Sequence, residues 1–125
     1  MISLLDAVLA KDVEQNESGI KSISDEIYDE DELVLGDVLP PFFKVWLVFK
    51  FQGPPGSMVK VAVEVLCVMG PITSFDSGSM AVPASGRGDC AIEVTIPVEE
   101  VGPYKVLLLF DGTEVWRRTL FFARR

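Results

Sequence analysis

VGPYKVLLLFDGTEVWRRTLFF, residues 101–122, contains every part of a β-hairpin in one continuous stretch. Its first half, residues 104–110, is apolar and aromatic but much too short for a membrane-spanning helix. Asp111-Gly112 follows at once, and this dipeptide favours the positive φ angles that tight hairpin turns require. The return segment, residues 113–122, mixes β-branched and aromatic side chains with Arg117 and Arg118. It completes the predicted hairpin.

The pairing of these two strands depends on the length of the turn. A two-residue turn at Asp111-Gly112 would place Leu107 beside Trp116. A three-residue turn with a bulge would instead place Leu108 across from Trp116, and Tyr104 across from Leu120. We favour the second register because it gathers large apolar side chains on one face, although Arg118 falls there too. That face comprises Tyr104, Val106, Leu108, Trp116, Leu120 and Phe122.

Further segments have the composition or the two-residue period of strands. The clearest is MVKVAVEVLCVM, in which the odd positions from Val59 to Cys67 are all apolar. Residues 11–19, 28–41 and 70–88 are rich in polar, Gly or Pro residues, so we predict connections there, the last with one short strand near 79–82. The predicted strands cover residues 2–9, 21–27, 43–52, 58–69, 89–98 and the two halves of the hairpin.

These strand candidates are separated by turn signals, and the chain has almost no helical period. Such a pattern predicts an all-β fold, an antiparallel two-sheet sandwich of about seven strands. A chain of 125 residues is expected to form one domain, residues 1–125, that buries roughly two thirds of its unfolded surface. The composition, 49% apolar and 24% charged, is typical of a packed core.

The net charge limits the classes of partner. At −8, the chain would be repelled from the phosphate backbone of nucleic acids and from anionic lipid over most of its surface. No run of residues approaches the 18 or more apolar residues of a membrane span. We therefore expect no nucleic-acid partner and no membrane partner.

Cys67 and Cys90 lie in strand-like segments and could face one another across a core. Two interpretations are open: a disulfide, as between the core cysteines of antibody domains, or two buried free thiols. We favour free thiols in a cytoplasmic protein. Residues 1–10 have no basic residues before their apolar run, include Asp6 and lead to no cleavage site, which is unlike a signal peptide.

The tract Gly102-Pro103-Tyr104-Lys105-Val106 resembles the tyrosine corner of immunoglobulin-like domains. In that motif a tyrosine at the start of a strand bonds its hydroxyl back to the preceding loop. The likeness implies the same bond for Tyr104. Antibody domains carry a cysteine two residues after the tyrosine, and Val106 occupies that place here, so the likeness does not imply their disulfide.

The whole chain resembles an uncharacterised family of short bacterial proteins. The resemblance lies in LLDAV at residues 4–8, SISDEIY at 22–28, the G-x-Y strand that starts at Gly102, and the hairpin at Asp111-Gly112. It therefore spans nearly the full length. It implies a bacterial immunoglobulin-like sandwich, and the family brings no known activity or site residues.

The sequence has few of the residues that catalysis usually needs. It contains no histidine, which removes the commonest general base and zinc ligand, and its two cysteines form no C-x-x-C pair. No glycine-rich phosphate loop is present. We therefore predict no enzyme activity, no catalytic residues and no cofactor. Arg87-Gly88-Asp89 spells the tripeptide that integrins recognise, but we interpret it as a tight turn before a strand.

An acidic cluster suggests an alternative function. Carboxylates crowd residues 25–32, and hard carboxylate oxygens bind Ca²⁺. The cluster lacks the spacing of an EF-hand, which favours a solvated charged loop. The alternative is a small-ligand or Ca²⁺-binding sensor that uses this loop, with Asp29, Asp31 and Glu32 as candidate ligands.

The principal functional prediction rests on apolar residues on predicted outer faces. Trp46, Val48 and Leu66 are such residues, and Arg117 and Arg118 lie on the return strand of the hairpin. If contiguous, they would form a patch for a protein partner or a second copy of the chain; otherwise the N-terminal segment covers them. A free edge strand could also recruit another strand. We predict a non-catalytic immunoglobulin-like binding or assembly module that acts through a sheet face or edge.

Overall fold

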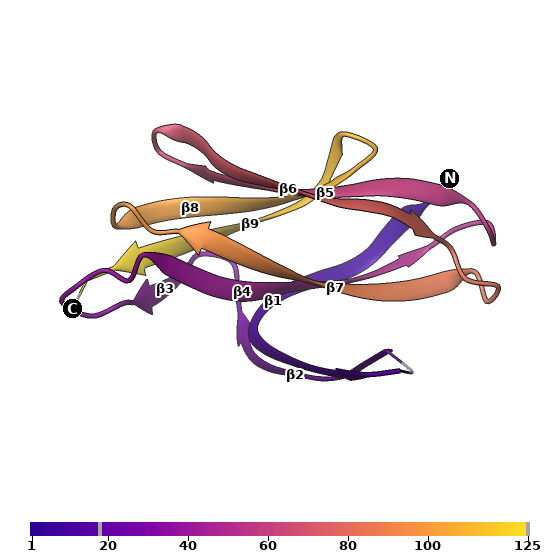
Figure 1. Ribbon diagram of the computed structural model, residues 1–125, viewed down its shortest axis with the longest axis horizontal. Coiled ribbons are helices and arrows are strands. Elements are labelled where there is room, and N and C mark those ends of the chain that lie inside the picture. The colour runs from indigo at the N-terminus through magenta and orange to yellow at the C-terminus, as the bar shows by residue number, and fades with distance from the viewer. Residues whose placement is uncertain (18, 125) are drawn as a thin grey trace.

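The computed structural model describes residues 1–17 and 19–124, and all of its regular structure there is β-strand (Figure 1). No helix among these residues is long and apolar enough to cross a membrane. The strands are β1 (Ser3–Asn16), β2 (Gly19–Ile27), β3 (Asp31–Val34), β4 (Phe42–Gln52), β5 (Met58–Cys67), β6 (Gly70–Ala81), β7 (Arg87–Pro97), β8 (Gly102–Phe110) and β9 (Thr113–Ala123).

Two sheets pack face to face, as the alternation predicted (Figure 1). The four-stranded sheet has the order β2-β1-β4-β7, and the five-stranded sheet has the order β3-β9-β8-β5-β6. Every neighbouring pair is antiparallel except β3 and β9, which are parallel. The predicted two-sheet sandwich is confirmed, with nine strands in the described residues instead of about seven.

The two additional strands lie in segments that the sequence predicted as connections. β3 occupies part of residues 28–41, where it pairs with β9 and its Leu33 packs against the core. β6 spans most of residues 70–88 and not only the short strand expected near 79–82. Its pairing with β5 shifts register at Val61/Ala62 and at Val65/Leu66. Such irregularities insert extra residues and hide the two-residue period.

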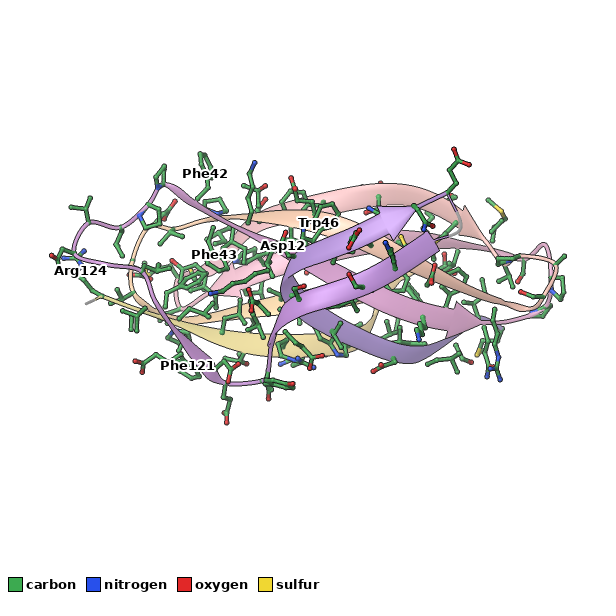
Figure 2. All side chains as sticks on the ribbon, turned by 90° about the horizontal axis from the view of Figure 1, so that it is seen from below. Asp12, Phe42, Phe43, Trp46, Phe121 and Arg124 are labelled. Atoms are coloured by element: carbon green, nitrogen blue, oxygen red, sulfur yellow. The ribbon has the colours of Figure 1, made fainter. Side chains whose placement is uncertain are left out.

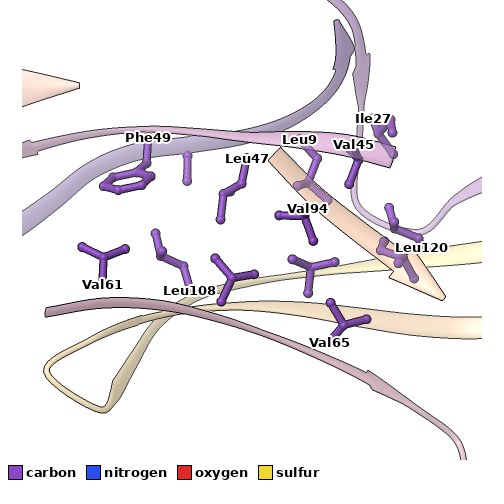
Figure 3. Packing of buried hydrophobic residues seen from close by; sticks show 14 of the residues in the cluster. Leu9, Ile27, Val45, Leu47, Phe49, Val61, Val65, Val94, Leu108 and Leu120 are labelled. Atoms are coloured by element: carbon purple, nitrogen blue, oxygen red, sulfur yellow. The ribbon is translucent and has the colours of Figure 1, made fainter. Parts of the chain in front are cut away.

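The core lies between the sheets and is made of the side chains that alternation placed inward (Figure 3). The odd residues of β5 from Val59 to Val65 are buried against Leu47 and Phe49 of β4 and their neighbours. No polar or charged residue in the described chain is buried. The apolar face of one sheet therefore closes on that of the other without a buried charge that would need a partner.

The β8–β9 hairpin combines features of both registers considered above. Leu108 lies across from Trp116 and Tyr104 across from Leu120, so the favoured pairing is confirmed. The three-residue turn is wrong, because Phe110 pairs with Thr113 and leaves only Asp111-Gly112 in the turn. Asp111 and Gly112 have φ angles of 50° and 81°, as a type I′ turn requires. The extra residue falls inside the ladder, where the register shifts beyond Leu108.

The tyrosine corner is present. Tyr104 is buried, and its hydroxyl donates a hydrogen bond to Glu100 O at 2.8 Å. The same oxygen accepts hydrogen bonds from the backbone N–H groups of Glu99 and Glu100, at 3.4 and 3.3 Å. The hydroxyl therefore forms hydrogen bonds with main-chain groups of the loop that leads into β8, as the resemblance implied.

The N-terminal hairpin adds a partial third layer. Up to Ala10, β1 pairs with β4; beyond it β1 pairs only with β2. Residues 11–16, predicted as a connection, thus continue the strand. Figures 1 and 2 show this hairpin turned back across the outer face of the four-stranded sheet. Near its tip, a Cβ built on Gly19 would lie 3.4 Å from the Asp89 carboxylate of β7. The hairpin therefore extends across the outer face as far as the edge strand β7.

Candidate interaction edge

The residues predicted to form an interface do not form one patch. Trp46 and Val48 alternate with the buried residues of β4, so they face the outside of the four-stranded sheet. Leu66 alternates in the same way with the buried residues of β5, on the outside of the five-stranded sheet. Because these are opposite sides of the sandwich, a single partner surface that joins them is excluded.

Coverage by the N-terminal hairpin accounts for the two residues of β4. Val48 is only 4% exposed, and it lines a hollow of about 320 Å³ together with four residues of β2, Ile20, Lys21, Ser22 and Ile23. Val48 is therefore buried, and the prediction that it lies on an exposed surface is wrong. Trp46 is half-buried, and Figure 2 shows it near the base of the hairpin. The large apolar residue left open at this end of β4 is Phe42, which is 57% exposed.

The two arginines have separate roles within the chain. Arg117 is exposed and forms a bidentate pair with Glu114, with Nε and Nη2 at 2.9 and 2.6 Å from the carboxylate oxygens. Its hydrogen bond lowers the pKa of Glu114. Arg118 donates to Ile27 O at 2.7 Å, and its guanidinium lies 5.0 Å from the centre of the Trp116 ring. Arg118 thus ties β9 to the end of β2.

The acidic cluster supports local structure. Asp29 Oδ1 accepts a hydrogen bond from Thr119 N, and Asp31 Oδ2 accepts one from Tyr28 N, each at 2.8 Å. Glu32 is exposed on β3. In residues 1–17 and 19–124, no three Asp, Glu, Cys or His side chains gather as a metal site would require. The candidate Ca²⁺ ligands are therefore not brought together.

The tripeptide Arg87-Gly88-Asp89 is strand and not the predicted turn. It begins β7 and pairs with residues 52, 51 and 50 of β4, while the turn lies just before it, where Gly86 N–H donates to Pro83 O at 2.9 Å. Beside it lies an open hollow of about 590 Å³. Its lining residues are Leu5, Lys50, Phe51, Met80, Ala81, Pro83, Arg87, Gly88 and Asp89.

Neither cysteine forms a disulfide. Both Cys67 and Cys90 are free and half-buried. Burial, and secondarily the negative charge of Asp89, raise the pKa of the Cys90 thiol above its ordinary value of 9.0. A raised pKa leaves little thiolate at neutral pH, so Cys90 is a poor nucleophile in the isolated chain.

The free side of β7, which faces away from β4 and is called the β7 edge below, is the most regular strand edge in the described chain. β7 pairs with β4 from Arg87 to Pro97 without any register shift. Val98 N–H donates to Pro41 O at 3.0 Å and continues the same register. Because antiparallel ladders alternate, even-numbered residues bond to β4 and odd-numbered residues direct N–H and C=O to the β7 edge.

Local contacts at both ends of β7 limit the open stretch. Ser85 Oγ donates to Arg87 O at 3.0 Å and accepts from Arg87 N at 3.4 Å, which confirms that Arg87 directs its main chain away from β4. Pro97 has no N–H. No other strand of the described residues pairs with this side of β7. The residues between, with open donors and acceptors, are Asp89, Ala91, Glu93 and Thr95.

The other three sheet edges of the described chain have features that hinder the addition of a further strand. β6 is interrupted by two register shifts and contains Pro71. β3 has only four residues. β2 belongs to the folded-back hairpin and has a register shift against β1 between Glu14 and Gln15. Short strands, bulges and prolines hinder the addition of a further strand, so β7 is the edge where pairing is easiest.

Sequence reasoning foresaw an edge but not which strand provides it. The regular alternation of residues 89–98 was visible, and it indicates a ladder without bulges. Its place at the end of a sheet depends on the order of strands, which alternation does not encode. The signal that was available is Pro97, because proline within a strand is typical of an edge.

Comparison with known proteins identifies the fold. No known protein-family model matches the sequence, and no curated protein matches it. A crystal structure of an immunoglobulin-like protein from Pseudomonas aeruginosa matches with a TM-score of 0.55 and 13% identity, over 98% of this chain and 97% of that one. The likeness is one of fold. This chain has an immunoglobulin-like fold.

Two enzymes contain a similar sandwich as part of a longer chain. The alkylpurine DNA glycosylase AlkC from Pseudomonas fluorescens, bound to DNA with an abasic site analogue, matches with a TM-score of 0.55 and 15% identity over 73% of this chain and 27% of that one. β-Glucosidase from Listeria innocua matches with a TM-score of 0.53 and 13% identity over 98% of this chain and 16% of that one. This chain thus spans about a quarter of the first enzyme and about a sixth of the second.

Proposed function

We propose that this chain is a non-catalytic immunoglobulin-like binding or assembly module that engages its partner by strand addition at the β7 edge. The observation that carries the proposal is the open row of main-chain groups at Asp89, Ala91, Glu93 and Thr95, on a strand without bulges. Main-chain pairing supplies affinity in this mode, and the exposed side chains on alternate positions supply specificity.

Several observations support a role without catalysis. The chain has no histidine. The hollow beside Arg87 is open, and of the groups that line it only Lys50, Arg87 and Asp89 are charged. In the two enzymes the similar sandwich is only 27% and 16% of the matched chain. DNA, which the glycosylase binds, is not a partner we propose here, because the net charge of −8 opposes contact with phosphates.

We further propose that the chain belongs with short bacterial immunoglobulin-like proteins and acts in the cytoplasm. The mutual coverage of 98% and 97% with the Pseudomonas aeruginosa protein supports the first point, because the likeness spans nearly all of both matched chains. The free state of Cys67 and Cys90 fits a reducing compartment.

The test compares two alanine-to-proline variants, one at the β7 edge and one at the free edge of β6. Ala91 directs its N–H to the β7 edge, so Ala91→Pro removes one donor there and leaves the β4 ladder intact. Ala81 is the matched control: Val82 N–H donates to Ser57 O, so Ala81 directs its N–H to the free side of β6. Either substitution should leave the far-ultraviolet circular dichroism of the folded chain unchanged.

Affinity capture from the native cell, quantified by mass spectrometry, provides the measurement. We expect wild type and Ala81→Pro to enrich the same protein, or further copies of this chain. The amount of this partner captured by Ala91→Pro should be at least tenfold lower. If Ala91→Pro retains the partner, or if Ala81→Pro loses it equally, strand addition at the β7 edge is wrong.

A further inference from the structure

We propose that the partner at the β7 edge is a second copy of this chain, paired antiparallel about a two-fold axis that passes between the two Cys90 residues. This inference rests on the proposed function, since it names the occupant of the same edge. The two four-stranded sheets would join there into one continuous sheet.

The alternation of β7 restricts the possible registers. Odd-numbered residues direct their main-chain groups to the β7 edge, so odd-numbered residues of one copy must oppose odd-numbered residues of the other. The two-fold axis then passes through a residue position. The axes that pair at least two residues of the open stretch pass through residues 90 to 94. Within β7, an axis at Glu93 places Glu93 opposite its own copy and an axis at Val94 places Glu93 opposite Thr95, so neither brings unlike charges together.

The registers differ in which charged side chains of β7 they place opposite each other. An axis at Cys90 places Arg87 of each copy opposite Glu93 of the other. An axis at Ala91 places Asp89 opposite Glu93 twice, which brings like charges together. An axis at Ile92 places Asp89 opposite Thr95 and brings no opposite charges together. Directly opposed unlike charges stabilise an antiparallel pair and like charges destabilise it, so the register at Cys90 is favoured.

The side chains concerned lie on the proper face for these contacts. Arg87, Asp89 and Glu93 are exposed, and they alternate with residues that face the core, such as Val94 and Ile96. In the favoured register, Asp89 and Ala91 exchange main-chain hydrogen bonds across the axis. Arg87 contributes chiefly its guanidinium, because its main-chain groups already contact Ser85 Oγ.

Cys90 distinguishes this register from the others, because only here does it lie opposite its own copy. It is even-numbered, so the two copies of Cys90 would form a non-hydrogen-bonded pair, with Cα atoms about 4.5 Å apart. That separation lies within the range that disulfides accept. With the axis at Ile92, Cys90 would instead oppose Val94 and could not meet its copy.

Sedimentation velocity of the full chain near physiological salt provides the first test. We expect wild type and Ala81→Pro to dimerise and Ala91→Pro to remain monomeric. Arg87→Glu and Glu93→Arg should each weaken the dimer about tenfold or more, because the symmetry repeats each like-charge contact twice. The double variant Arg87→Glu with Glu93→Arg should restore it. A double variant as weak as the single ones would overturn the proposed register.

Cross-linking with diamide in mildly alkaline buffer provides the second test, because diamide accepts the two electrons and two protons that the paired thiols lose. Cys67→Ser should yield a covalent dimer and Cys90→Ser should not. A wild type that stays monomeric yet captures a different protein through the β7 edge would overturn this inference and leave the proposed function standing. A dimer that persists in Ala91→Pro would also overturn this inference, and it would overturn the proposed function only if the captured partner persists in that variant as well.

Discussion

Gly88 shows how a single absent side chain permits the packing at the start of β7. It pairs with Phe51, whose ring occupies the space a side chain would need: a Cβ at Gly88 would lie 2.6 Å from Phe51 Cζ and 3.1 Å from Pro83 Cδ. We expect Gly88→Ala to lower the free energy of unfolding by about 1–3 kcal/mol through overpacking. Urea denaturation provides the measurement.

A double-mutant cycle separates this steric cause from a general effect of alanine on the strand. In a Phe51→Leu background the ring atom that blocks the Cβ is gone, so Gly88→Ala should cost clearly less than it does in wild type. An equal cost in both backgrounds would show that contact with the ring is not the cause.

Cys90 gives the chain a predictable response to alkaline pH. Burial and Asp89 raise its pKa in the folded state above 9.0, so the unfolded chain loses the thiol proton first as pH rises. The contribution of Cys90 to stability is therefore constant below about pH 9 and falls as pH rises from there through the folded-state pKa.

Chemical denaturation at a series of pH values checks this response. Compared with Cys90→Ala, wild type should lose additional stability between neutral pH and pH values above 9.0. A Cys90→Ala variant whose stability changes with pH as steeply as that of wild type would contradict the prediction.

At the scale of elements, the type I′ turn that joins β8 to β9 is also a contact with β5. Asp111 Oδ1 accepts from Lys60 N at 2.9 Å, and Asp111 N donates to Lys60 O at 2.8 Å. Asp111→Ala removes the first bond and places alanine at a φ of 50°, so we expect a loss of about 1–2 kcal/mol. Thermal unfolding provides the measurement.

Asp111→Asn is the matched variant for this turn. Asparagine keeps a side-chain oxygen for Lys60 N–H and tolerates a positive φ, so it should retain most of the stability that Asp111→Ala loses. Equal losses in the two variants would assign the effect to the carboxylate charge and not to turn geometry.

Elements with a local signal were predictable, and those that depend on their neighbours were not. β5 and β7 follow strict alternation, and their predicted bounds agree with the structure to within two residues. β3 is a strand because it pairs with β9. Its four residues are too few to show the alternation by which a strand is predicted from sequence. β6 is long, but its bulges break the period on which prediction relied.

The same distinction applies to the candidate site. Alternation correctly placed Val48 on the outer face of β4, yet the returning β1–β2 hairpin buries it. Arg118 was visible as a charge on an apolar face, but its partner, Ile27 O, is distant in sequence. The β7 edge depends on strand order. Long-range topology therefore decides which of the foreseen surfaces remain accessible.

At the scale of the whole molecule, excess negative charge should make stability depend on ionic strength. A net charge of −8 on a compact chain produces self-repulsion. Salt weakens it, since the screening length falls from about 30 Å at ~0.01 M to about 8 Å at ~0.15 M. We expect the Tm to rise with NaCl over this range, measured in an Ala91→Pro background to exclude association.

A variant with less charge tests whether repulsion is the cause. Glu32 and Asp37 are exposed, and replacing both with lysine changes the net charge from −8 to −4, because each substitution adds two positive units. The salt-dependent rise in Tm should then shrink. The exposed pairs Lys21–Glu14 and Arg117–Glu114 act in the opposite direction, because salt weakens attraction as well. A Tm that falls with NaCl in both variants would mean that these attractions outweigh the repulsion.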